Sequence, residues 1–197
     1  MNYESFLELV KKRRSIRQFK PEPIPDEYLD KIIEAARWAP SGMNSQPWEF
    51  IVVKNKEKRE KIVEIISLIR QRAGRSGATG YTNAPVFVIL CGDTKTKEAY
   101  RGQLADSIFN SSLANAFLYM VLAVTTLGLG AQWVSFISFP TVQAAVKELL
   151  DIPEELEIYD MLALGYPDME PNPRPVRDRE EMVHHGYYAR TKLPIEP

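Results

Sequence analysis

The chain has 197 residues, of which 45% are hydrophobic and 26% are charged. These values are typical of one folded globular domain and exclude a disordered or collagen-like chain. The 25 lysines and arginines are balanced by 26 acidic residues, which leaves a net charge of -1. The broad positive surface of a nucleic-acid binder is therefore missing, and any anion site must be local. A single cysteine, Cys91, and an N-terminus without a signal-peptide pattern lead us to expect a cytoplasmic protein.

Hydrophobic periodicity predicts helices and strands that alternate along the chain. We expect a short helix around residues 6–10, a helix from residue 26 to about 39, a strand at 48–53 and a helix at 57–70. After a glycine-rich loop at 72–83, a strand at 86–91 precedes a long apolar helix at about 106–127. A strand at 131–136, a helix at 140–150, a strand at 158–167 and an extended arm complete the chain. The sum is a single α+β domain over residues 1–197, with few strands covered by helices.

The stretch from residue 107 to 146 carries no charge and could be mistaken for a membrane span. Polar residues such as Asn110, Asn115 and Thr125 lie on different sides of a helix drawn there, and flanking lysines or arginines are missing. We therefore expect no membrane contact. An apolar helix of this kind must be covered by other protein on every side, which suggests a second subunit.

Three arginines and a serine fall within five positions directly after the first helix. These residues are Arg13, Arg14, Ser15 and Arg17. Guanidinium groups bind phosphate oxygens through bidentate, charge-assisted hydrogen bonds, so the cluster is a candidate phosphate site. A solvated basic patch is the alternative, because short basic runs are common on protein surfaces.

A second polar group lies between two prolines, in the connection from the second helix to the first strand. Its candidate residues are Pro40, Ser41, Gly42, Asn44 and Gln46. Amides, hydroxyls and free backbone N–H groups in a stiff frame suit a heterocycle with carbonyl groups and ring nitrogens. An ordinary helix-to-strand connection is the alternative interpretation.

Other chemistries have little support in the sequence. Gly128 and Gly130 follow a helix instead of opening one, so they do not form a dinucleotide-binding fingerprint. The only histidines, His184 and His185, are adjacent and have no further metal ligands nearby, so we expect no metal. Neither a G-x-S-x-G elbow nor a P-loop occurs, and Cys91 is expected to be a small core residue.

Taken together, the segments RRSIRQF, AARWAPSGMNSQPWEFIVV, NAPVFVIL, LGLGAQWVSF, LALGYP and REEMVH resemble the FMN-dependent nitroreductase family in order and spacing. The resemblance spans nearly the whole chain. It implies a nitroreductase-like α+β fold with a central, mainly antiparallel sheet covered by helices. It also implies an intertwined homodimer with FMN at the subunit interface, in which the arm from about residue 167 extends over the partner.

The resemblance also implies roles for individual residues. Arg13, Arg14, Ser15 and Arg17 would bind the FMN phosphate, the ribityl chain and the pyrimidine edge. The residues from Pro40 to Gln46 named above would reach the flavin of the other subunit, and Trp133, Val134 and Ser135 would lie against its rings. Arg177 best matches the family's terminal arginine. Because RDREEM departs from the usual pattern there, Arg174 or Arg179 is an alternative.

The activity implied by the resemblance is ping-pong hydride transfer from NADH or NADPH, through flavin N5, to a small acceptor such as an aromatic nitro compound or a quinone. No catalytic side chain is expected, since the cofactor carries the chemistry. Two alternatives remain open at this stage: a flavin-binding sensor or store with little turnover, and a specialised reductive dehalogenase of the same family. A dehalogenase would need a lid, for which residues 73–83 are the available segment.

Overall fold

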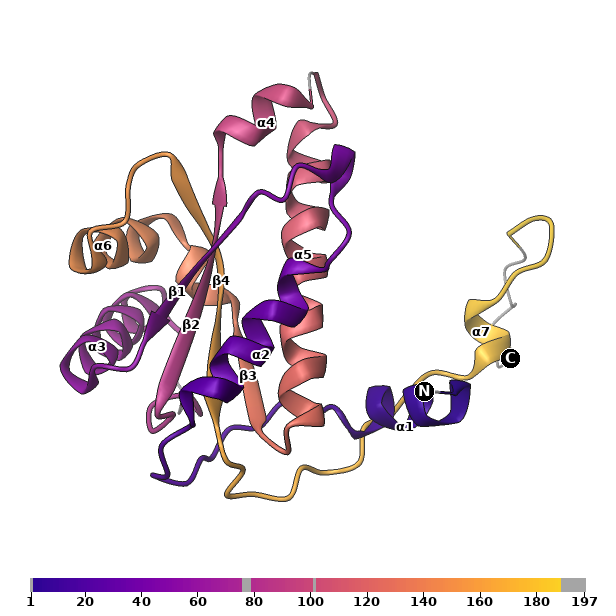
Figure 1. The fold of residues 1–197 in the computed structure, drawn as a ribbon, viewed down its shortest axis with the longest axis horizontal. Helices are drawn as coiled ribbons and strands as arrows, with labels where there is room; N and C mark the ends of the chain where they lie inside the picture. Colours follow the sequence, from indigo (N-terminus) through magenta and orange to yellow (C-terminus); the bar gives the residue numbers. More distant parts are fainter. Residues whose placement is uncertain (1, 76–78, 101, 189–197) are drawn as a thin grey trace, which may run out of the picture.

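The centre of the molecule is an antiparallel sheet of four strands in the order β1-β2-β4-β3 (Figure 1). The computed structural model describes residues 2–75, 79–100 and 102–188. The strands are β1 (Trp48–Val53), β2 (Val86–Asp93), β3 (Gly130–Val134) and β4 (Leu156–Gly165). Residue Leu90 of β2 lies opposite Asp160 of β4, and Trp133 of β3 lies opposite Leu162.

Helices cover both faces of this sheet. α2 (Asp26–Arg37) and α5 (Ala105–Thr126) lie on one face, and α3 (Lys56–Arg72) and α6 (Pro140–Leu150) lie on the other (Figure 1). Because successive residues of a strand point to opposite faces, Val88 and Leu90 pack under α2 and α5, whereas Phe87 and Ile89 pack under α3 and α6. Coverage of both faces explains why β2 is an unbroken apolar run.

α5 is long and apolar enough to cross a membrane, with a mean hydropathy of 1.5. In the structure it packs against the sheet and α2, and Phe109, Leu113 and Phe117 are buried there. Leu118 and Tyr119 of the same helix remain exposed to 43% and 38%. α5 is therefore the central helix expected from the sequence, with two large apolar side chains left exposed in the single chain.

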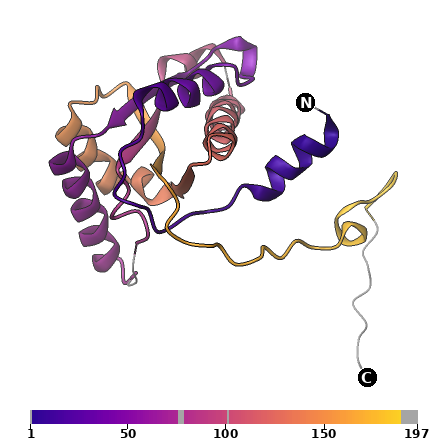
Figure 2. The same ribbon diagram turned by 60° about the horizontal axis from the view of Figure 1, so that its bottom comes forward.

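Both ends of the chain leave the body of the molecule. α1 (Tyr3–Lys12) buries none of its residues, and the C-terminal arm carries the short α7 (Arg179–Met182) outward on the same side of the molecule (Figure 2). Between α1 and α2 the chain follows the sheet edge: the Ile16 amide donates to the Ala131 carbonyl of β3 at 2.9 Å. Phe19 forms a bridge with Pro167, where the arm begins.

Most predicted elements are confirmed, with differences at their ends. The predicted strand at 131–136 stops at Val134, because residues Ser135–Ser138 turn into a 3-10 helix, η2, that leads into α6. α3 continues two residues further than expected, to Arg72. Three further short helices were not predicted: η1 (Gly42–Asn44), α4 (Lys95–Ala99) and α7. Of the predicted loop and arm, residues 76–78 and 189–197 lie outside the described residues.

Candidate functional site

The predicted phosphate-binding residues line a common hollow of about 510 Å³. Arg13, Arg14, Ser15 and Arg17 form one wall, and the first part of the C-terminal arm forms the other. The arm contributes Met169, Pro171, Asn172, Pro173, Arg174 and Pro175. The structure thus adds one further arginine, Arg174, to the four residues that the sequence placed together. We call this hollow the basic hollow.

Backbone contacts on both sides hold the basic hollow in shape. The Arg17 amide meets the Met169 sulfur at 3.2 Å, and the Arg14 guanidinium donates to the Asn172 carbonyl. Gly80 lies directly against Arg17, where a Cβ atom would come within 2.3 Å of the arginine Cβ. Only glycine permits so close an approach. The arginines are therefore positioned by three segments that are far apart in the sequence.

The basic hollow has an excess of positive charge. Among the described residues, no ion pair involves any of its four arginines. Burial, followed by the neighbouring charges of Arg174 and Arg14, lowers the pKa of Arg13. Several guanidinium groups held together without a carboxylate suit a multiply charged oxyanion such as a phosphate, which would supply both the countercharge and the hydrogen-bond acceptors.

Trp133, Val134 and Ser135 continue along the sheet edge from this hollow, since Ser15 and Ala131 form a parallel bridge. The Trp133 ring packs against Phe117 of α5 with centroids 4.1 Å apart and the rings tilted by 35°, and 39% of Trp133 is exposed. Val134 is buried, and Ser135 is exposed at the start of η2. An exposed indole ring and an exposed serine beside the basic hollow could form a wall for a flat ring system.

Asp160 lies beneath this wall and was not predicted. The Trp133 indole N–H and the Ser135 hydroxyl, the latter at 3.2 Å, donate to the same carboxylate oxygen of Asp160. Burial raises the pKa of Asp160 to about 6, and the two hydrogen bonds oppose that rise. A lone carboxylate inside the apolar segment IYDMLALG was the sequence feature that could have identified it.

The proline-flanked loop is strained and tightly fastened to α5. Met43, Asn44 and Gln46 all have positive φ, between 46° and 54°, which is uncommon for residues other than glycine. The Gly42 amide donates to Ser112 Oγ at 3.0 Å, and the Asn115 side chain donates to the Pro40 carbonyl at 3.0 Å. Such strain persists only where the surroundings impose it, and it is concentrated at functional sites.

This loop does not meet the basic hollow within one chain. The loop contacts α5 at Ser112 and Asn115. In the basic hollow, Ser15 instead forms a bridge with Ala131 of β3, the strand that follows the other end of α5 (Figure 1). Thr126 lies 14 positions after Ser112 in α5, which corresponds to about 20 Å along a helix axis. Pro40, Ser41, Gly42, Asn44 and Gln46 therefore lie at one end of the molecule, and the arginines lie at the other.

Arg177 also lies outside the basic hollow. Its guanidinium pairs with the Glu181 carboxylate at 3.1 Å, one turn along the chain. Arg174 lines the basic hollow together with Arg13, Arg14 and Arg17 instead. Among the described residues, no group of three or more histidine, cysteine or acidic side chains could hold a metal ion.

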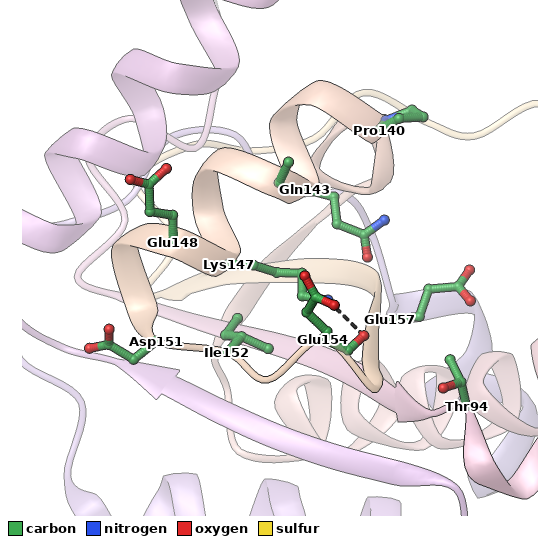
Figure 3. Close-up of a pocket in the computed structure, with 10 residues that line it drawn as sticks. Thr94, Pro140, Gln143, Lys147, Glu148, Asp151, Ile152, Glu154 and Glu157 are labelled. Atoms are coloured by element: carbon green, nitrogen blue, oxygen red, sulfur yellow. Dashed lines mark hydrogen bonds between the residues drawn. The ribbon is translucent and has the colours of Figure 1, made fainter.

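A larger hollow of about 740 Å³ lies between α6 and the start of β4 (Figure 3). Four acidic side chains line it, and its one lysine, Lys147, donates to the Glu154 carbonyl at 3.0 Å. The acidic residues are Glu148, Asp151, Glu154 and Glu157. An excess of negative charge repels phosphate, so this hollow is a poor match for the predicted ligand.

Comparison with known proteins identifies the family of the chain. The profile of the Nitroreductase family matches residues 10–166. A protein of Methanothermobacter thermautotrophicus, provisionally named NADH dehydrogenase/NAD(P)H nitroreductase, is 33% identical over 176 residues, which cover 89% of this chain and 84% of the relative. Iodotyrosine deiodinase of Thermotoga neapolitana is 31% identical over 189 residues, covering 89% and 94%.

A solved structure gives the same result for the fold. The nitroreductase with bound FMN from Bacteroides fragilis is 28% identical, with a TM-score of 0.76, and the match covers 94% of this chain and 100% of that one. The antiparallel sheet flanked by helices is the nitroreductase fold. The chain therefore belongs to the nitroreductase family of oxidoreductases.

Proposed function

We propose that this protein is an FMN-dependent oxidoreductase that passes hydride from NADH or NADPH to a small aromatic, quinone or nitro acceptor by a ping-pong mechanism. The basic hollow carries this proposal, because four arginines without a carboxylate partner among the described residues provide a phosphate site. The FMN-bound relative of known structure supports the choice of cofactor.

The chain's own residues would bind and orient the cofactor. Arg13, Arg14 and Arg174 would hold its phosphate, and the guanidinium of Arg17 would stabilise negative charge at the pyrimidine edge. Bound there, FMN would supply hydride acceptance and donation at N5 in two half-reactions. The Trp133 and Ser135 wall, held from below by Asp160, would limit the position of the rings. No side chain needs to act as an acid or base, since solvent or substrate can provide protons.

We propose further that the working unit is an intertwined homodimer in the cytoplasm. One chain keeps the loop at Pro40 to Gln46 away from its own basic hollow, so a second chain is needed to complete each site. The exposed Leu118 and Tyr119 of α5, and the exposed Tyr3 and Phe6 of α1, supply apolar surface for that contact. The arm from about residue 167 would cover the partner within the domain of residues 1–197.

The test is to purify the protein, record its visible spectrum and identify the compound released on denaturation. We expect a yellow dimer that releases FMN on denaturation. NADH or NADPH should bleach the yellow colour under argon at least as fast as the protein turns over. A colourless protein that does not bind added FMN would overturn the proposal. A yellow protein that neither donor bleaches would instead be a flavin store or sensor.

A reductive dehalogenase is the second candidate, and the iodotyrosine deiodinase relative favours it. It is distinguished by the acceptor: iodide release from iodotyrosine by the reduced protein supports dehalogenation. Turnover of nitroarenes or quinones without iodide release supports the first proposal.

A further inference from the structure

A third hollow, of about 670 Å³, lies between the end of α3 and η2. Its walls include Arg70 and Arg75 on one side and Ser135, Phe136 and Phe139 on the other. Ser135 also belongs to the proposed ring wall of the FMN site. The hollow therefore opens beside the place where the reaction would occur, and we call it the side hollow.

Both arginines of the side hollow face the same aromatic ring. The Arg70 guanidinium lies 5.5 Å from the centroid of Phe136, and the Arg75 guanidinium lies 5.7 Å from it. Phe136 in turn is stacked on Phe139 with centroids 5.3 Å apart and an angle of 3° between the rings. The side hollow thus presents two parallel aromatic rings and two cationic groups.

The two positive charges lack a countercharge in the part of the chain that the structure describes, since neither arginine belongs to any of its ion pairs. Arg70 is half-buried, which limits its access to water. A ring face attracts a cation only weakly at an exposed site and accepts none of the guanidinium's directional hydrogen bonds. Two guanidinium groups beside one ring are therefore matched by an anionic group, such as a carboxylate or phosphate, whose oxygens accept their hydrogen bonds.

We propose that the side hollow binds the anionic group of a flat aromatic ligand that reacts at the FMN site. Phe136 and Phe139 would pack against the ring of this ligand, while Arg70 and Arg75 would bind its carboxylate or phosphate oxygens. The anion can come from the acceptor, as an aromatic carboxylate, or from the nicotinamide donor, as its phosphates. This inference rests on the proposed function, because Ser135 joins the side hollow to that site.

The test uses calorimetric titration of the purified protein, which needs no turnover. Benzoate is compared with neutral benzamide to probe the acceptor, and NADP+ with NAD+ to probe the donor. The variant Arg70→Gln/Arg75→Gln removes both charges. Arg72→Gln is the matched control, since Arg72 lies in the same last turn of α3 but does not line the side hollow.

We expect the double variant to weaken the binding of benzoate or of NADP+ about tenfold or more, with little effect on benzamide. An equal loss for NAD+ would assign the pyrophosphate that both nucleotides share, and a loss for NADP+ alone would assign its additional phosphate. Arg72→Gln should leave all four affinities unchanged. The anion whose affinity falls identifies the source. Unchanged affinities for both anions in the double variant, or an equal loss in the control, would overturn the inference. Failure of FMN binding with benzoate binding intact would refute the proposed function and leave an anion site in the side hollow.

Discussion

Replacing Asp160 by asparagine removes a buried negative charge and keeps an oxygen that can accept hydrogen bonds from Trp133 and Ser135. Only 6% of Asp160 is exposed, and burial raises the pKa of its carboxyl group from 3.8 to about 6. The native protein therefore holds this proton over a pH range in which the unfolded chain has lost it. Across that range the free energy of unfolding must fall as the pH rises.

The size of this effect follows from the two pKa values. They differ by about two pH units, and one unit corresponds to about 1.4 kcal/mol. Ionised Asp160 thus lowers the stability of the native protein by about 3 kcal/mol above pH 6. The contribution is absent below pH 3.8, where the carboxyl is protonated in both states. We expect Asp160→Asn to be more stable than the wild type at pH 7.5, by up to about 3 kcal/mol, and nearly equal to it at pH 4.

Urea unfolding of the FMN-free protein at fixed protein concentration, at pH 4 and pH 7.5, measures this difference. Asp30→Asn, on the exposed side of α2, controls for the change in net charge. Trp133 supplies a second measurement: its fluorescence should titrate with a midpoint near pH 6 in the wild type and not in Asp160→Asn. An asparagine variant that is less stable than the wild type at pH 7.5 would refute the reasoning, because the hydrogen bonds to the ionised form would then outweigh its desolvation.

The remaining predictions concern the cofactor site and the core. Arg174→Ala should weaken FMN binding roughly 10- to 100-fold in a fluorescence titration. Arg177→Ala should leave FMN binding close to that of the wild type. Equal losses in the two variants would contradict the position of Arg177 outside the basic hollow. Gly42→Ala should lower the free energy of unfolding by about 1–3 kcal/mol in thermal unfolding, because a Cβ there would lie 2.2 Å from Ile108 Cγ2. Adding Ile108→Ala should restore most of this loss. If it restores none, this contact is not the cause. Cys91 should not react with a thiol reagent until the protein unfolds, since burial raises its pKa to about 12; rapid labelling of the native protein would contradict that burial.

Local patterns in the sequence predicted the helices and strands well where the apolar residues of an element lie on one face. The spacing of Leu29, Ile32 and Ala36 predicted α2, and these residues are buried in the structure. The long apolar stretch forms α5, which packs against the sheet and α2 as expected of a central helix. The end of β3 was placed two residues too late because Ser135 and Phe136 continue a strand-like pattern, whereas in the structure they begin η2, which leads into α6 at Pro140.

The candidate site was predictable where its residues are neighbours in the sequence. Arg13, Arg14, Ser15 and Arg17 stood out as a cluster, and the structure does bring them together around one hollow. The choice between Arg174 and Arg177 could not be made in this way, because three arginines occur within six positions of the arm. Their distinction depends on how the arm returns to the N-terminal segment.

The sequence by itself determined the family, the order of the elements and the local clusters of arginines and amides, because these depend on residue type and spacing over a few turns. The tertiary structure decided what lies beside what. It placed Asp160 under Trp133 and Arg174 in the basic hollow, and it set Arg70 and Arg75 over Phe136. These pairs are separated by between 27 and about 160 positions along the chain, and only the pairing of strands and the packing of helices onto the sheet bring them together.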